Sequence, residues 1–268
     1  MTDTTSTSAQ DNGPLAGNVL FYGQPEPLSV EQHGKLGVKA LAKPYAFVAQ
    51  THIVPLTVTE FAPAALSYPV IFVGEARQPV AVMGLRPGEN LYVSEQGDFR
   101  PEAYIPAYVR RYPFVFANDE VQKRLILCID RGAPFLTETE IEAPLFVGNE
   151  PSDYTKQAME FCNNFEQERV RTDSFVQLLK DLDLFEVREA HFTPRAADGQ
   201  PGEPHKLAEY FAVSEDKLKA LPAEKLVELR DNGALGQIYA HMVSLMGWDR
   251  LIAMAFVRSS EMPTAANA

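Results

Sequence analysis

The stretch YIPAYVRRYPFVF, Tyr104–Phe116, gathers aromatic side chains, two prolines and a pair of arginines into one short segment. Tyrosine and phenylalanine carry large apolar area, whereas a guanidinium buried beside them must be paired or stacked. The segment therefore indicates a core element that contains a polar cluster. Because Pro106 and Pro113 cannot donate to a sheet ladder, we predict an ordered turn and a single helical turn here, and no central strand.

The residues on either side of this stretch favour strands. Val70–Val73 and Pro79–Leu85 predict two strands joined by a hairpin loop. Lys123–Asp130 is apolar on both faces, which is typical of a central strand. Tyr45–Gln50 alternates well enough to predict a further strand, which His52–Leu56 continues to a sheet edge.

Two shorter segments complete this β-rich part. Thr59–Leu66 predicts a short helix with Thr57 or Thr59 near its N-cap, because threonine caps helices and Glu60 follows early, where the helix dipole favours an acid. Gln24–Ser29 predicts a turn-rich connector.

After about residue 150 the apolar period becomes helical. Between Ser152 and Leu182 apolar residues recur at spacings of three and four, which predicts a long amphipathic helix capped by Ser152 or Asp153. Phe185–Thr193 and His205–Val213 flank a Gly/Pro-rich turn and predict a β-hairpin. Shorter helices follow to the end of the folded part, and Gly233 stands where a left-handed glycine is expected to end one helix before the next begins near Ala234.

These elements predict an α+β fold. Its N-terminal half is β-rich, with a mixed or antiparallel sheet, and its C-terminal half is helical and packs on that sheet. We expect a disordered lead over 1–17 and a single domain over 18–258, β-rich over 18–150 and mainly helical over 151–258. A flexible tail is expected over 259–268.

The composition excludes several classes of partner. A net charge of −12 and a pI near 4.9 argue against non-specific nucleic-acid binding and against docking on anionic lipid. The first residues lack the basic and apolar regions of a secretory signal, and no run is long enough to span a bilayer. We therefore expect a soluble cytoplasmic protein, in which Cys128 and Cys162 are buried thiols and form no disulfide.

The arginine pair is the first candidate for a functional site. Arg110 and Arg111 each offer a planar fork of donors, suited to a carboxylate or a phosphate. Tyr104, Tyr108 and Tyr112 could stack on these guanidinium groups or donate beside them. These five residues are the predicted ligand-binding set for an anionic small molecule or peptide.

The alternative is a structural role for the same residues. One arginine would then pair with an internal carboxylate, such as Glu60 or Asp130, and the other would be solvated. His241 and Ser244, three residues apart on a helix, could form a base and a nucleophile, although such a pair more often satisfies a buried imidazole. We expect no catalytic residue here.

No metal or cofactor motif is visible. The histidines are scattered singly, without the spacing that binds zinc or iron. The glycines of Gly84–Asn90 form neither a dinucleotide fingerprint nor a phosphate-binding loop. We expect no metal and no cofactor.

Several segments together resemble the bacterial SapC family. Besides Tyr104–Phe116, they are Tyr68–Phe72, Gly84–Leu85, Asn90–Tyr92 and Gly233–Leu245. The resemblance extends from about Asn18 to Phe256. It implies no established catalytic constellation, but members similar to this chain tend to be encoded beside TonB-dependent receptors and flavin-dependent halogenase-like proteins.

Two functions follow as hypotheses. The first is a non-enzymatic accessory or binding protein that acts with a protein partner from such an uptake or halogenase-like system. The alternative is an enzyme that acts on an anionic small molecule or peptide through an Arg/Tyr-lined pocket. A homodimer is the default expectation for the oligomeric state.

Overall fold

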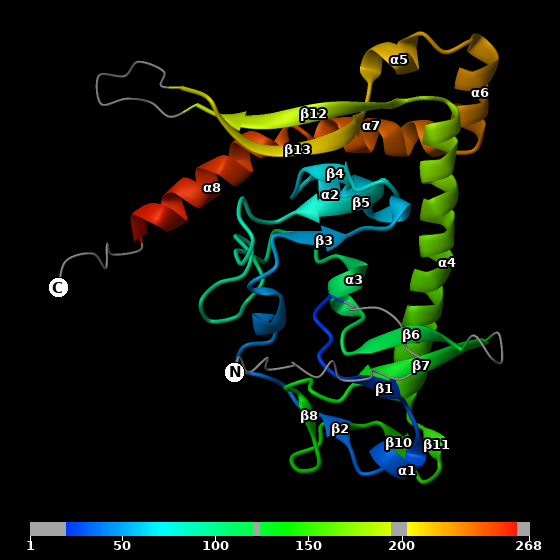
Figure 1. The fold of residues 1–268 in the computed structure, drawn as a ribbon. Coiled ribbons are helices and arrows are strands. Elements are labelled where there is room, and N and C mark those ends of the chain that lie inside the picture. The colour runs from blue at the N-terminus through cyan, green and yellow to red at the C-terminus, as the bar shows by residue number, and fades with distance from the viewer. Residues whose placement is uncertain (1–19, 120–123, 194–202, 262–268) are drawn as a thin grey trace, which may run out of the picture. The chain divides into compact units, whose positions relative to one another are not determined.

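The computed structural model describes residues 20–119, 124–193 and 203–261 (Figure 1). The chain divides into two compact units that are interleaved in sequence. Unit 1 comprises residues up to Lys39 together with Tyr112–Cys162, and unit 2 comprises Ala40–Arg111 together with the chain from Asn163 onward. The predicted lead 1–17 and residues 262–268 of the predicted tail lie outside the described residues. The single domain over 18–258 stays a prediction.

Unit 1 contains a three-stranded antiparallel sheet in the order β1-β7-β6. Its strands are β1 (Pro25–Pro27), β6 (Phe114–Asp119) and β7 (Arg124–Asp130). The central position predicted for β7 is confirmed. The connector predicted over Gln24–Ser29 was wrong in part, because β1 pairs with β7 there. Proline lacks an N–H group, and an edge strand is the place in a sheet that tolerates this lack.

The rest of unit 1 consists of short elements around a small core. These are α1 (Val30–His33), β2 (Gly37–Val38), β8 (Leu136–Thr137), β9 (Ala143–Pro144), β10 (Phe146–Val147), β11 (Glu150–Pro151) and the first turns of α4 (Asp153–Asp181). Strand β2 lies between β8 and β9, and β10 pairs with β11. Cys128 and Cys162 are buried free thiols, as predicted.

Unit 2 contains a five-stranded antiparallel sheet in the order β12-β13-β4-β5-β3. Its strands are β3 (Ile53–Pro55), β4 (Val70–Val73), β5 (Gln78–Val82), β12 (Phe185–Phe192) and β13 (His205–Val213). Both predicted hairpins, β4–β5 and β12–β13, are confirmed, and so is the edge position of β3. The two hairpins are far apart in sequence and meet where Phe211 of β13 pairs with Phe72 of β4.

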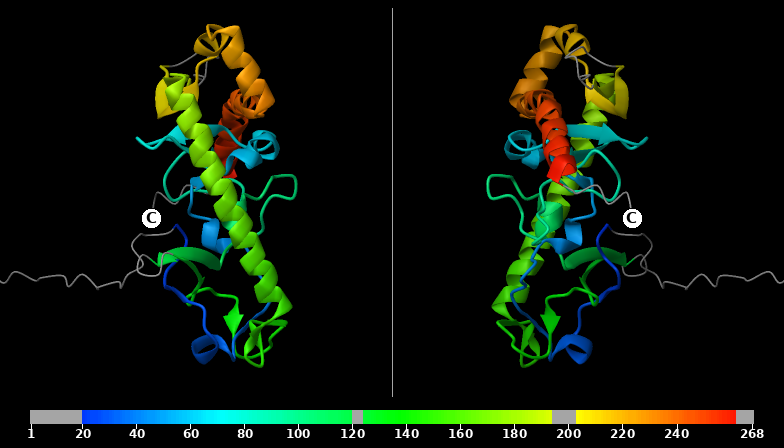
Figure 2. Two further views of the ribbon diagram at one scale, coloured as in Figure 1. Left: turned by 90° about the vertical axis from the view of Figure 1, so that its right-hand side faces the viewer. Right: turned by 90° about the vertical axis from the view of Figure 1, so that its left-hand side faces the viewer.

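Unit 2 also contains helices. They are η1 (Ala46–Val48), η2 (Val58–Glu60), α2 (Phe61–Ala65), α3 (Ala107–Arg110), the later turns of α4, α5 (Glu215–Lys219), α6 (Ala223–Asp231), α7 (Ala234–Ser244) and α8 (Gly247–Glu261). Of these, α2, α3 and α7 contact strands of the five-stranded sheet. Helix α7 contacts α2, α6, β4 and β13, and the turn from α6 into α7 is visible in Figures 1 and 2. The α+β class with antiparallel sheets is confirmed.

The predicted caps hold where the structure describes them. Thr57 and Glu60 form a reciprocal capping box at the start of η2. Ser152 accepts a hydrogen bond from the backbone N–H of Thr155 at 3.2 Å, which caps α4. Gly233 has a φ of 80°, the left-handed conformation that ends α6 and begins α7.

The strand predicted over Tyr45–Gln50 was wrong. Ala46–Val48 form the 3-10 helix η1, with turn bonds from Val48 N–H to Tyr45 and from Ala49 N–H to Ala46. Only Val48 of these three is buried. A short apolar run does not distinguish a strand from one turn of helix by its period alone.

Candidate functional site

Arg110 and Tyr104 form one part of the predicted site, in unit 2. Pro106 precedes the single helical turn α3, as predicted, and Arg110 ends that turn on the surface. The Arg110 guanidinium donates from Nε to the carbonyl of Ile105 at 3.0 Å and from Nη2 to the hydroxyl of Tyr104 at 3.1 Å. This geometry folds the arginine back onto its own turn.

Glu60 is the centre of this arrangement, with only 4% of its surface exposed. Its Oε1 accepts from the Tyr104 hydroxyl at 3.0 Å and from the Ala107 N–H at 2.6 Å. Its Oε2 accepts from both the N–H and the hydroxyl of Thr57, each at 2.8 Å. Four donors therefore surround one buried carboxylate, which joins the start of η2 to the start of α3.

The phenol of Tyr104 remains protonated at neutral pH in this setting. Burial, followed by the negative charge of Glu60, raises the pKa of Tyr104 to about 12. The hydroxyl is therefore a donor to Glu60 and an acceptor from Arg110, and it cannot serve as a general base near neutral pH.

Arg111 and Tyr108 form a second part, also in unit 2. The guanidinium carbon of Arg111 lies 4.0 Å from the ring centre of Tyr108 and 4.5 Å from that of Phe165. The two rings meet edge to face, 6.1 Å apart. Arg111 is buried, so this is the stacked guanidinium that the sequence indicated, and Phe165 of α4 is a partner that the sequence analysis did not name.

Tyr112 belongs to unit 1. Its hydroxyl donates to Oδ2 of Asp130 at 3.0 Å, and its ring contacts Tyr22 edge to face. Asp130 also accepts from the backbone N–H groups of Gly23, Gln24 and Gly132. Burial, and then the charge of Asp130, raises the pKa of Tyr112 well above its usual value.

The structure thus joins Tyr104 to Arg110 and Tyr108 to Arg111, and it places Tyr112 in the other unit. The internal carboxylates proposed as arginine partners, Glu60 and Asp130, both accept from tyrosine hydroxyls. Ligand binding by the five residues stays a prediction.

His241 and Ser244 hold α7 on the sheet. Nε2 of His241 accepts from the N–H of Val213 at 3.1 Å, so Nδ1 carries the proton donated to the carbonyl of Val70 at 2.9 Å. The Ser244 hydroxyl accepts from the N–H of Val70 at 2.9 Å and donates to the backbone carbonyl of His241 at 2.6 Å. The hydroxyl does not donate to the imidazole, and the pair is structural.

Acid should therefore destabilise unit 2 through His241. Burial lowers the pKa of His241 to about 4, so the folded state holds the neutral ring. A histidine in the unfolded chain titrates at ~6.5, so the contribution of the neutral His241 ring to the free energy of unfolding is complete above that pH. This contribution falls by about 3 kcal/mol as the pH drops to 4. NMR titration of the imidazole measures the pKa, and urea unfolding from pH 7 to 4 measures the loss. A titration midpoint near 6.5, or an unchanged acid slope in His241→Gln, would contradict this account.

Sequence analysis missed an exposed apolar stripe on α7. The stripe consists of Tyr239 and Val243 on α7 and of Met246 in the turn after it. Their exposed fractions are 53%, 58% and 79%. The four-residue spacing places Tyr239 and Val243 on one side of α7, away from the buried Ile238 and His241, and Met246 lies in the turn that follows. The sequence contained the signal for this stripe, because apolar residues occur on more than one side of α7 and only one side can pack on the core.

Some classes of site find no support in the described part of the chain. His, Cys, Asp and Glu side chains of residues 20–119, 124–193 and 203–261 form no group of three that could hold a metal ion. Among the helices of those same ranges, none has the length and apolar character to cross a bilayer.

Comparison with known proteins gives one match. The model of the SapC family matches residues 28–251, which is most of the chain. No curated protein and no solved structure matches it.

Proposed function

The chain belongs to the SapC family, and from that premise we propose that it is a non-enzymatic accessory protein that binds a protein partner. The partner that we propose is a component of a TonB-dependent uptake system or a flavin-dependent halogenase-like protein. The proposed place of action is the cytoplasm.

The observation that supports this proposal is the apolar stripe on α7. More than half of the surface of each of Tyr239, Val243 and Met246 is exposed. Tyrosine and methionine are enriched at protein interfaces, and contiguous exposed apolar surface marks interaction sites. Leu66, 77% exposed, follows α2, a helix that contacts α7. A partner that covers the α7 stripe would remove the apolar area of Tyr239, Val243 and Met246 from water.

The enzyme hypothesis receives less support from the geometry. It needs the arginines and tyrosines to converge on a pocket without internal carboxylate partners. Tyr104 instead donates to Glu60, and Tyr112 donates to Asp130. Arg110 donates to the hydroxyl of Tyr104 and to its own turn.

The test is to isolate the tagged chain gently from its host and to compare native with denaturing mass spectrometry. We expect a stoichiometric second polypeptide, identified by its peptides as a TonB-system or halogenase-like protein. Val243→Glu places a charge in the stripe without altering the core, and should abolish the complex.

Val170→Glu is the matched control, because Val170 is a 56% exposed valine on α4, another helix. It should keep the complex. Equal retention by both variants would refute the α7 interface. If the chain is instead a dimer and Val243→Glu dissociates it, the partner at the stripe is a second copy of the chain. A small mass excess without a second polypeptide would favour the enzyme hypothesis.

A further inference from the structure

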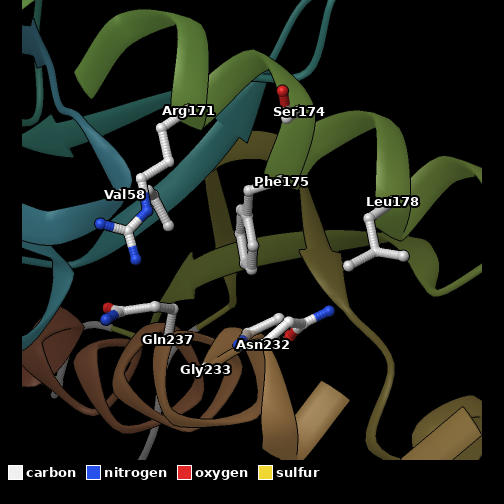
Figure 3. A pocket seen from close by; sticks show the side chains of 9 residues that line it. Val58, Arg171, Ser174, Phe175, Leu178, Asn232, Gly233 and Gln237 are labelled. Carbon is white, nitrogen blue, oxygen red and sulfur yellow. Dashed lines mark hydrogen bonds between the residues drawn. The ribbon is translucent and has the colours of Figure 1, made fainter. Parts of the chain in front are cut away.

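A cavity of about 180 Å³ opens between α4, η2 and the turn from α6 into α7, wholly within unit 2. One water needs only ~15 Å³ and drug-sized ligands need ~300 Å³ or more, so the space suits a small metabolite. In Figure 3 the guanidinium of Arg171, from α4, and the amide of Gln237, from α7, lie on the same side of the Phe175 ring.

The apolar part of the cavity is formed by buried, well-packed side chains. Val58, Phe175 and Ala234 line it and are themselves buried. The N–H of Val58 donates to the hydroxyl of Thr172 at 2.8 Å, which ties η2 to α4. Phe175 packs edge to face on Phe61 at 5.8 Å. This lining can receive an apolar side chain without rearrangement.

Two buried acceptor atoms, one in the cavity lining and one on a side chain that pairs with Arg171, have no hydrogen-bond partner among the described residues. One is Oε1 of Gln237, which lines the cavity, and the other is Oε2 of Glu168. Glu168 lies one turn before Arg171 on α4, and its other oxygen is 3.8 Å from the Arg171 guanidinium. Because buried polar atoms are nearly always satisfied, the orphaned acceptor of Gln237 in the cavity lining, with that of Glu168 one turn from Arg171, calls for a donor from outside the described residues.

Donors for an anion stand at the same cavity. The Arg171 side chain is 61% exposed and can reorient its fork toward a ligand. The N–H groups of Gly233 and Ala234, which line the cavity at the start of α7, already donate to the carbonyl of Arg230 at 3.2 Å and to Oδ1 of Asn232 at 2.9 Å. An anion would therefore rely on the Arg171 fork. The cavity thus offers donors for a carboxylate, acceptors for an ammonium group and an apolar wall.

We propose that this cavity binds a small zwitterion, an α-amino acid with an apolar side chain. Its carboxylate binds Arg171, its ammonium group donates to Gln237 and Glu168, and its side chain packs on Phe175 and Val58. A simple carboxylate would leave both acceptors unsatisfied, and a simple amine would leave the guanidinium unused. The site is independent of the proposed partner surface, which occupies the opposite side of α7.

The experiment is an NMR titration of the full-length protein with L-leucine and with L-phenylalanine. We expect saturable shifts of the Gln237 side-chain amide and the Arg171 Nε–H. The analogues lacking the amino group, 4-methylpentanoate and 3-phenylpropanoate, and those lacking the carboxylate, isopentylamine and phenethylamine, should bind at least about tenfold more weakly.

Arg171→Met should weaken binding about ten- to a hundredfold, because it removes a charge-assisted contact. Gln237→Met should weaken it about fivefold or more. Arg169→Met is the matched control: Arg169 is an exposed arginine of the same helix that pairs with Glu166 and Asp173, and its loss should leave the affinity unchanged.

Three results would overturn the proposal. They are the absence of saturable shifts at Gln237 with either amino acid, equal binding of a deaminated or decarboxylated analogue, and equal effects of Arg171→Met and Arg169→Met. None of them bears on the α7 stripe, so the failure of one proposal leaves the other standing.

Discussion

Replacing Glu60 by alanine should lower the free energy of unfolding of unit 2 by about 4 kcal/mol. The carboxylate accepts four hydrogen bonds, from Thr57, Tyr104 and Ala107, and it is almost fully buried. Its removal leaves all four donors without this acceptor, those of Thr57 in a buried site, and it opens a cavity besides. Glu60→Gln should lower the free energy of unfolding by at least about half of the loss in Glu60→Ala, because the amide NH₂ of glutamine would face donors of the site where the carboxylate oxygen accepted.

Urea unfolding followed by tryptophan fluorescence measures this effect in the right unit. The chain has a single tryptophan, Trp248, and it lies in unit 2. Glu75→Ala, an exposed carboxylate in the β4–β5 turn, is the control and should change stability by less than about 0.5 kcal/mol. Arg110→Ala should cost less than about 1 kcal/mol, since Arg110 is exposed. If Glu60→Ala costs no more than Arg110→Ala, the central role of Glu60 is wrong.

Replacing Asp130 by alanine should destabilise unit 1 by about 3 to 4 kcal/mol. Asp130 is 1% exposed and accepts from the hydroxyl of Tyr112 and from the backbone N–H groups of Gly23, Gln24 and Gly132. These contacts hold the chain that enters β1 and the turn that leaves β7. Without the carboxylate these four donors lose their acceptor, and they stay unsatisfied wherever water cannot enter.

The two thiols of unit 1 report this unfolding directly. Cys128 and Cys162 are both buried there, so their reaction with an aromatic disulfide reagent in urea follows the opening of unit 1. Tyr112→Phe removes only one of the four donors and should cost about 1 kcal/mol. Equal losses for Tyr112→Phe and Asp130→Ala would show that the backbone N–H groups do not depend on the carboxylate.

The sequence analysis named Glu60 and Asp130 as internal partners, but it did not anticipate the tyrosine hydroxyls that donate to them. It assigned them to an arginine, since an acid near a guanidinium is the common ion pair. The structure gives Glu60 the hydroxyl of Tyr104 and gives Asp130 the hydroxyl of Tyr112. Which donor reaches a carboxylate depends on side-chain directions in the folded chain, and no spacing along the sequence encodes them.

Local features could be predicted from the sequence because the interactions that make them are local. The helical turn at Ala107–Arg110 follows from Pro106, and the start of α4 follows from the Ser152 cap. The apolar period of Ser152–Leu182 and the glycine at 233 predicted α4 and the start of α7. The two hairpins of unit 2 follow from turn residues between strand-forming runs.

Only the tertiary structure decided which distant segments meet. The pairing of β13 with β4, the stacking of Arg111 on Phe165, and the cavity between α4 and α7 all join residues more than 50 positions apart. The sequence by itself determined the α+β class, the element types and most caps, since period and capping act over a few residues. Packing decides which strands become neighbours, which buried acceptors have no partner and which apolar faces stay exposed. Interactions between residues that are close in sequence do not determine this packing.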